Sequence, residues 1–135
     1  MPTPTLCMVL IHWKIKKGRE PDFEAKWKTV YKITEREGLI GEFLSRAEKR
    51  GASYPYVTWP IVCANLAHEE NCTHYINVGL WNSHERFYEE VGKNMKDDKD
   101  KEDFEIERRR RVAITAAEWR IGPAQLPSND SPGTA

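Results

Sequence analysis

The sequence predicts an α+β fold in which strands and helices follow one another in the order βαββαβ. Four segments have the composition of strands, and they are residues 7–16, 39–49, 74–81 and 110–121. Two segments repeat apolar residues at helical spacing, and they are residues 21–36 and 84–95. This order repeats a βαβ unit twice. It predicts a four-stranded antiparallel sheet with both helices on one face, which is the ferredoxin-like arrangement.

Length and composition favour a single soluble domain. The chain has 135 residues, of which 39% are hydrophobic and 31% are charged, so one core suffices. We expect one domain over residues 1–121. Its 21 basic and 21 acidic residues balance, which excludes a general attraction to nucleic acid or to anionic lipid. No apolar run approaches the roughly 20 residues of a membrane span, and the first residues lack the basic start of a signal peptide. We therefore expect no membrane partner and a cytoplasmic location.

The first half of the chain reads as a strand, a helix and a second strand. The run "CMVLIHWKIK" at residues 7–16 is apolar and rich in strand formers. Pro21 suits the first turn of a helix, and Phe23, Trp27 and Tyr31 then repeat at a spacing of four. Gly38 is expected to stop this helix before the strand at 39–49.

The second half repeats the pattern after a long connection. Residues 51–72 are too long for a hairpin loop and are expected to form an insertion or flap. After the strand at 74–81, Ser83 is expected to cap a helix. A short helical turn is expected at 104–108, before the strand at 110–121. Residues 122–135 are rich in Pro, Gly and Ser and are expected to form a disordered tail.

Both faces of the predicted central strands carry apolar side chains. In the strand at 74–81, Ile76, Val78 and Leu80 share one face, and the odd positions share the other. Two helices can cover only one face of a sheet, and a large bare apolar face is rare on a soluble monomer. We therefore expect the odd positions to meet the helices and the even positions to be buried in a face-to-face homodimer.

Asn77 is the residue of this strand that packing explains least well. Its amide lies in an apolar strand, where a group without hydrogen-bond partners costs about 1–3 kcal/mol. Gly79 leaves space beside it, and Trp81 supplies a large ring on the same face. Together these residues predict a pocket wall. The alternative is that the amide of Asn77 bonds to neighbouring backbone or to buried water.

Other motifs carry little chemistry. The four histidines and three cysteines show no metal-ligand spacing, so no metal site is expected. His12 is expected on the dimer-facing side. The basic run from Arg108 to Arg111 is cancelled by the acidic residues upstream, and strand geometry would divide it between two faces. One of these arginines is nonetheless expected to reach inward towards an anionic or oxygen-rich molecule.

Two stretches, "IHWKIKKGREPDFEAKWK" and "YINVGLWNSHERFYE", resemble the antibiotic biosynthesis monooxygenase family. The first is similar to the opening strand and helix of that family, and the second to its third strand and W-x-S-x-x-x-F signature. The stretch "FEIERRRRVAITAAEW" is similar to its last strand. The resemblance covers residues 8–121 apart from the insertion. It implies the fold of the dimeric α/β-barrel superfamily.

The resemblance also implies a function, namely a cofactor-independent monooxygenase that acts on an aromatic or polyketide-type small molecule and O2. It implies catalytic roles for Asn77 and Trp81. Tyr88 is expected to act as proton relay, because Phe87 occupies the position of the family's tyrosine. The substrate-binding residues that we expect are Trp13, Tyr75, His84 and Phe87.

Two alternatives stay open at this point. One is a non-catalytic dimer that binds a small molecule or haem. The positions at which haem-degrading relatives carry an asparagine and a histidine hold Ile11 and Val91 here, which disfavours haem degradation. The other alternative is an isomerase, cyclase or lyase, because a fold does not determine a reaction.

Overall fold

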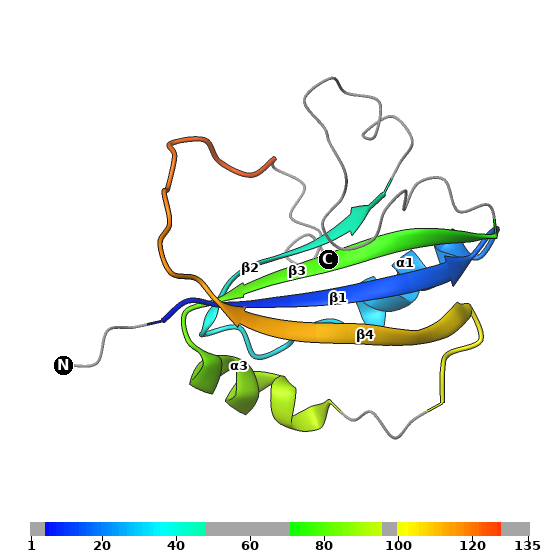
Figure 1. The fold of residues 1–135 in the computed structure, drawn as a ribbon, viewed down its shortest axis with the longest axis horizontal. Helices are drawn as coiled ribbons and strands as arrows, with labels where there is room; N and C mark the ends of the chain where they lie inside the picture. Colours follow the sequence, from blue (N-terminus) through cyan, green and yellow to red (C-terminus); the bar gives the residue numbers. More distant parts are fainter. Residues whose placement is uncertain (1–4, 48–70, 96–99, 128–135) are drawn as a thin grey trace.

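The structure is a computed structural model in which residues 5–47, 71–95 and 100–127 are described. In chain order its elements are β1 (Cys7–Lys16), α1 (Glu20–Thr29), β2 (Leu39–Arg46), β3 (Cys72–Trp81), α3 (His84–Glu90), the 3-10 helix η2 (Gly92–Asn94) and β4 (Glu105–Thr115). The strands form one antiparallel sheet in the order β2-β3-β1-β4, with α1 behind it and α3 beside β4 (Figure 1). This is an α+β fold consistent with the predicted ferredoxin-like arrangement.

β1 lies in the middle of the sheet and pairs with β3 on one side and β4 on the other. Every odd residue from Cys7 to Ile15 is buried, and every even one is half-buried. This is the period of two that a pleated strand imposes. The ring of Trp13 packs on Phe23 of α1 at a centroid distance of 4.7 Å, so the buried side of β1 is the side that faces the helices.

β3 confirms the predicted division of its faces. Tyr75, Asn77 and Trp81 are each at most 2% exposed, whereas the even positions from Ile76 to Leu80 are half-buried. The strand begins at Cys72, two residues earlier than predicted. β2 pairs with β3 on the side of β3 that faces away from β1. It starts at Leu39, as predicted. The last two residues of the predicted strand at 39–49 lie outside the described residues.

α1 ends at Thr29, so the predicted helix at 21–36 is too long. The residues that follow Thr29 include the β-branched Val30, Ile33 and Thr34, which lose side-chain freedom in a helix. Pro21 lies in the first turn as predicted. Because the chain leaves the helix at this point, Tyr31 packs against Trp13 at a ring distance of 5.5 Å.

α3 is also shorter than predicted. Ser83 caps it, since its side chain accepts a hydrogen bond of 3.1 Å from the backbone N–H of Arg86. The α-helix ends at Glu90 and continues as η2, whereas the sequence predicts one helix over 84–95. Glycine favours this break, because its conformational freedom makes it a poor helix former, and Gly92 begins η2.

Gly38 does not stop α1 as predicted. It lies nine residues after Thr29, the last residue of the helix, where the chain enters β2 and passes α3. A Cβ atom at this position would lie 2.5 Å from the Cβ of Arg86, which is too close for any side chain. The backbone N–H of Gly38 donates to the carboxylate of Glu90 at 3.1 Å. The glycine therefore permits close contact between this segment and α3.

The predicted helical turn at 104–108 is wrong, because β4 already begins at Glu105. The backbone N–H of Lys16 donates to the carbonyl of Phe104 at 2.9 Å, and Glu105 pairs with Ile15. Pairing with β1 therefore satisfies backbone groups that a helical turn would have bonded internally.

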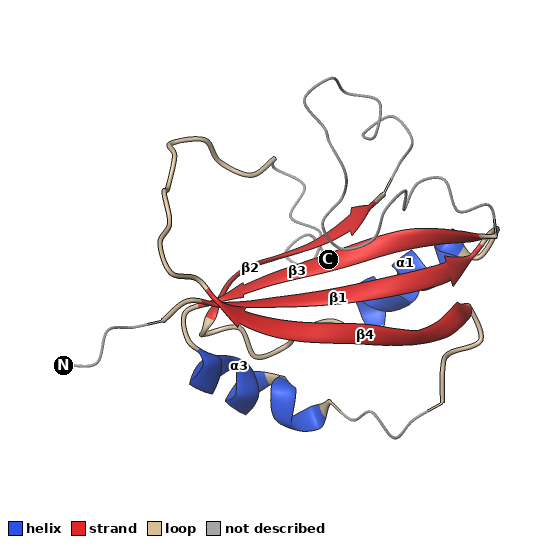
Figure 2. Cartoon of the chain, viewed as in Figure 1, coloured by secondary structure: helices blue, strands red, loops and turns tan. Residues whose placement is uncertain are grey.

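β4 ends at Thr115, whereas the sequence predicts a strand that continues to residue 121. Thr115 lies opposite Cys7, the first residue of β1, so beyond it β1 offers no strand to pair with. The following residues up to 127 form no helix or strand, and Figure 2 shows them as an extended loop. The remainder of the predicted tail lies outside the described residues.

The sheet face opposite the helices is apolar across all four strands. Phe43 lies opposite Val78, Val78 opposite Leu10, and Leu10 opposite Val112. Val112 is 51% exposed and Phe43 is 36% exposed. His12 lies on this same face, as predicted, and its Nε2 is 2.8 Å from the Nδ1 of His74.

Two further findings concern the part of the chain that is described. None of its helices is long and apolar enough to cross a membrane. Within the described residues, no group of three or more His, Cys, Asp or Glu side chains is arranged to hold a metal ion. The expected insertion at 51–72 lies outside the described residues except for its last two positions, of which Cys72 already belongs to β3.

Candidate functional site

A cavity of about 400 Å³ lies between the sheet and the two helices. β1 and β3 contribute its floor through Ile11, Asn77 and Gly79. α1, α3 and the residues that follow each helix contribute its walls. Its aromatic lining comes from both layers and consists of Trp13, Trp27, Tyr31, Trp81 and Phe87. The cavity is therefore built on the side of β3 where the sequence predicts a pocket.

The amide of Asn77 meets two side chains in this cavity. Its Oδ1 accepts a hydrogen bond of 2.7 Å from the Nε1–H of Trp27, and its Nδ2 donates one of 3.2 Å to Glu42. An indole N–H can only donate, so this contact determines which way the amide faces. The expected alternative, a bond to backbone or buried water, does not describe these contacts, because both partners are side chains.

Glu42 is a residue that the sequence analysis missed. It lies on β2 opposite Gly79, on the side that faces the helices, and it lines the cavity. Burial raises the pKa of its carboxyl group, while the hydrogen bond from Asn77 and the charge of Arg36 oppose that shift. The signal was present in the sequence, since an acidic residue stands between the apolar residues of "LIGEFLS". The bulge between Leu39 and Gly41 hides which face it occupies.

β4 brings basic side chains to the cavity. Its register with β1 shifts between the pairs His12–Arg110 and Lys14–Glu107, and a bulge of this kind redirects side chains. Three of the four consecutive arginines consequently line the cavity, namely Arg108, Arg109 and Arg111. The sequence predicts that one of the four arginines reaches inward. The bulge explains why three of them, and not two, lie on the cavity side of β4.

Arg109 has a structural role at the cavity wall. Its guanidinium lies 4.1 Å from the centroid of the Trp13 ring, at a distance typical of a cation–π contact. Its Nη2 bonds at 3.0 Å to Glu105, whose carboxylate is fully buried. The charge of Arg109 is therefore partly neutralised, and its bond to Glu105 helps to hold the guanidinium against Trp13.

Three of the other predicted site residues belong to the lining of this cavity. Trp13, Trp81 and Phe87 line the cavity, and Trp81 packs edge-on against Phe87 at a ring distance of 5.5 Å. The indole ring of Trp81 occupies the space beside Gly79, because a Cβ at Gly79 would lie 3.3 Å from the Nε1 of Trp81. The structure thus brings Trp13, Asn77, Trp81 and Phe87 together.

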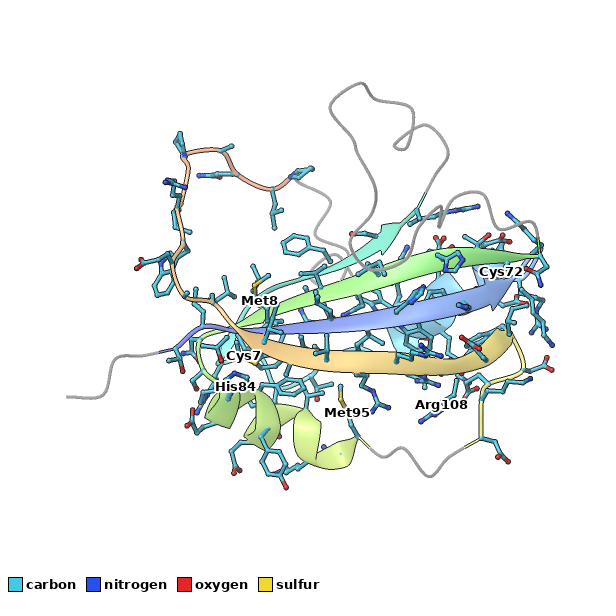
Figure 3. All side chains as sticks on the ribbon, in the orientation of Figure 1. Cys7, Met8, Cys72, His84, Met95 and Arg108 are labelled. Carbon is cyan, nitrogen blue, oxygen red and sulfur yellow. The ribbon has the colours of Figure 1, made fainter. Side chains whose placement is uncertain are left out.

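Three predicted residues do not line this cavity. Tyr75 donates a hydrogen bond of 2.5 Å to Glu24, and burial raises the pKa of its hydroxyl group. Tyr88 is 58% exposed on α3. His84 bonds to the Oγ1 of Thr115 at 2.9 Å, and it lies near Cys7 at the end of the sheet far from Cys72 (Figure 3). Sequence spacing could not separate these residues from the ones that do meet the cavity.

A second cavity of about 710 Å³ runs along the outer edge of β2. Charged side chains from α1, β2 and the connection between them line it, and they are Glu24, Lys28, Arg36, Glu42 and Arg46. It shares three lining residues with the first cavity, namely Trp27, Ile33 and Glu42. We call it the edge cavity and the first one the central cavity. The hydrogen-bonded group of Trp27, Asn77 and Glu42 therefore lies where the two cavities adjoin.

Comparison with known proteins identifies no family for the chain. No family model matches it, and no curated protein matches it. The resemblance to the antibiotic biosynthesis monooxygenases therefore stays a prediction, and the functional argument depends on the geometry of the central cavity.

Proposed function

We propose that the chain is a cofactor-independent monooxygenase-like enzyme that acts on an aromatic or polyketide-type small molecule and O2. The observation that supports this best is the central cavity, in which a buried amide shares one lining with five aromatic rings. Its volume of about 400 Å³ lies in the usual range of small-molecule sites. Flat rings stack on such walls, and the arginines of β4 favour a molecule that carries oxygen atoms or negative charge.

In the proposed reaction the bound substrate loses a proton and becomes an enolate or phenolate. Asn77 has a second N–H on Nδ2 besides the one donated to Glu42, and this N–H stabilises the developing oxyanion. Trp81 holds the plane of the ring. The anion transfers an electron to O2. When a CH2 group is converted to a carbonyl, one oxygen atom enters the product and the other leaves as water, so no external reductant is needed.

The proton relay expected at Tyr88 is not part of this proposal. Tyr88 is 58% exposed, and it does not line the central cavity. Tyr75 lines only the edge cavity, and its hydroxyl group is engaged with Glu24. A group that removes a proton must reach the substrate to within hydrogen-bonding distance, and neither hydroxyl group meets that condition.

Oxygen uptake by the purified, metal-free protein tests the proposal. A panel of polycyclic phenols and hydroxyquinones is offered, and each rate is compared with the uncatalysed one. We expect uptake with at least one member, and a loss of roughly 100-fold or more in Asn77→Ala. Asn82→Ala is the matched control, because Asn82 is exposed beyond the end of β3. Equal rates in the two variants would contradict the role of Asn77.

A second candidate is an isomerase or lyase that uses the same cavity. The observation that favours it is the carboxyl group of Glu42 beside the amide of Asn77, since proton transfer between this carboxyl group and a substrate needs no oxygen. Turnover in the absence of O2 distinguishes the two reactions. A product that forms anaerobically at the full rate supports the isomerase or lyase and removes the monooxygenase.

We further propose that the protein acts as a homodimer that buries the apolar face of its sheet. The row of Phe43, Val78, Leu10 and Val112 crosses all four strands, and Ile114 on β4 is 43% exposed. Exposed apolar side chains gathered in one patch favour association. A second copy of the same face is a partner that is always available, and a twofold axis closes the assembly.

A further inference from the structure

Glu42 differs from the other acidic residues of the central cavity in the hydrogen bonds that its carboxyl group makes. Its Oε2 accepts a hydrogen bond from Asn77, and its Oε1 makes no hydrogen bond to the described residues. One oxygen atom of the carboxyl group is therefore held in place, and the other is available to a bound molecule. The partner that holds it is a neutral amide, so no bonded cation lowers its affinity for a proton.

The other carboxyl groups of this cavity have cationic partners. Glu102 bonds to Lys26 at 2.7 Å, which lowers the pKa of Glu102. Glu90 accepts from Arg86 at 2.9 Å and from the backbone of Gly38. The carboxylate of Glu102, paired with Lys26, therefore accepts a proton poorly. Burial instead raises the pKa of Glu42, although the more distant charge of Arg36 opposes the effect.

The two cavities give Glu42 a route for a proton. A group that accepts a proton from a substrate must afterwards release it to water, or the site works only once. Glu42 lines the central cavity and also the edge cavity, whose other lining includes Lys28, Arg36 and Arg46. Its carboxyl group is therefore accessible from the substrate side and from a second, strongly charged side.

We propose that Glu42 is the proton acceptor of the site, that Asn77 positions it, and that the proton leaves through the edge cavity. This inference rests on the proposed function. The O–H or C–H bond of the substrate breaks, and its electron pair stays on the substrate as a phenolate or enolate. The proton forms an O–H bond with Oε1 of Glu42. A water molecule in the edge cavity later takes it up, which restores the carboxylate.

A chromogenic phenol tests this step without any turnover. 4-Nitrophenol absorbs differently as phenol and as phenolate, so its spectrum reports ionisation in the site. At a pH just below its solution pKa, we expect the wild-type protein to bind it as phenolate. Glu42→Gln should bind it as neutral phenol, with an affinity changed by no more than about threefold, because glutamine still accepts the hydrogen bond from Asn77. Glu35→Gln, at an exposed position, is the control.

The outcomes separate the two proposals. If both proteins bind the phenol in the same ionisation state, Glu42 is not the acceptor. If ionisation depends on Glu42 but oxygen uptake is absent with every substrate, the monooxygenase proposal fails while the role of Glu42 stands. If no phenol binds, both proposals fail.

Turnover supplies a second test when a substrate is found. Glu42→Gln is expected to lower kcat by roughly 100-fold or more while KM changes little, since a positioned base contributes about 10²–10⁴-fold. Raising the pH above the pKa of the substrate should restore the rate, because the substrate then arrives already ionised. A loss of rate that is equal at every pH would contradict the role as acceptor.

Discussion

In the lining of the central cavity, two hydrogen bonds join three polar side chains. Trp27 donates to Asn77, and Asn77 donates to Glu42. Each of these groups would be costly to bury without its partner, by about 1–3 kcal/mol. The arrangement explains how an amide is tolerated in the middle of an apolar strand. It also leaves a carboxyl group beside the cavity that burial disfavours in its charged form.

This carboxyl group should lower the stability of the protein at neutral pH. Because burial raises the pKa of Glu42, the folded state binds more protons than the unfolded state as the pH rises above about 4.5. The free energy of unfolding therefore falls as the pH rises from the unfolded-state pKa of Glu42 to its folded-state pKa. Glu42→Gln removes the penalty, so we expect a higher urea midpoint than wild type at about pH 7 and a smaller difference near about pH 4. A variant that is less stable at neutral pH would contradict this account.

Part of this hydrogen-bonded group is predictable from the sequence. Asn77 was identified because an amide in an apolar strand needs partners, and that argument requires no structure. Trp27 was read only as part of a helical stripe, since nothing in its spacing shows that its N–H meets Asn77. Glu42 was missed, because a bulge in β2 shifts its register. Local patterns reveal that a polar group needs a partner, but the sheet pairing decides which one it finds.

At the scale of elements, the two helices approach the sheet differently. α1 packs through Phe23, which is fully buried between Trp13 and Tyr75. α3 has no fully buried residue, and it is held by the packing of Phe87 on Trp81 and by close contact with the segment that leads into β2. That contact is made at Gly38, whose backbone bonds to Glu90. The position of α3, and with it one wall of the cavity, therefore depends on a glycine.

Gly38→Ala tests the packing of α3. An added Cβ would lie 2.5 Å from the Cβ of Arg86, so α3 must move away from the strand. We expect the free energy of unfolding to fall by about 1–3 kcal/mol, the usual cost of overpacking. Gly122→Ala is the matched control, because no atom lies within 4 Å of its added Cβ. If urea denaturation gives equal values for both variants, the contact does not hold α3.

The elements that sequence reasoning predicted well are those with a complete local signal. Burial alternates along the whole of β1 and along β3 from Tyr75 to Trp81, and Ser83 is an ordinary helix cap. The errors lie at element ends. α1 stops at Thr29 because β-branched residues follow it, and β4 begins at Glu105 because β1 offers it a partner. The ends of such elements depend on competition between local helix or strand propensity and pairing with distant strands. The spacing of residues in the sequence does not reveal that pairing.

At the scale of the whole molecule, the sheet separates two surfaces with different chemistry. The helix side carries the central cavity, with its rings, its arginines and the half-buried carboxyl group of Glu42. The opposite side presents an apolar row across all four strands. The βαββαβ order accounts for this division, because both helices pack on the same side of the sheet. Association through the apolar row would leave the central cavity of each copy intact.

Val112→Glu tests the proposed dimer. A charge in the centre of β4 on the apolar face would be buried against the second copy, so we expect the protein to sediment as a monomer at micromolar concentration. Ile121→Glu is the control, because Ile121 is 86% exposed and lies beyond the sheet. Wild-type protein that is itself monomeric under these conditions would contradict the dimer.

If aromatic molecules bind between the sheet and the helices, the indole N–H signals of the tryptophans in the central cavity report the binding. In a ¹⁵N-labelled sample titrated with the best phenolic ligand, we expect the signals of Trp13, Trp27 and Trp81 to shift together with one dissociation constant. Trp119 is an internal control, since it is 54% exposed and lies beyond β4. If Trp119 shifts while the three cavity signals stay unchanged, the central cavity is not the binding site.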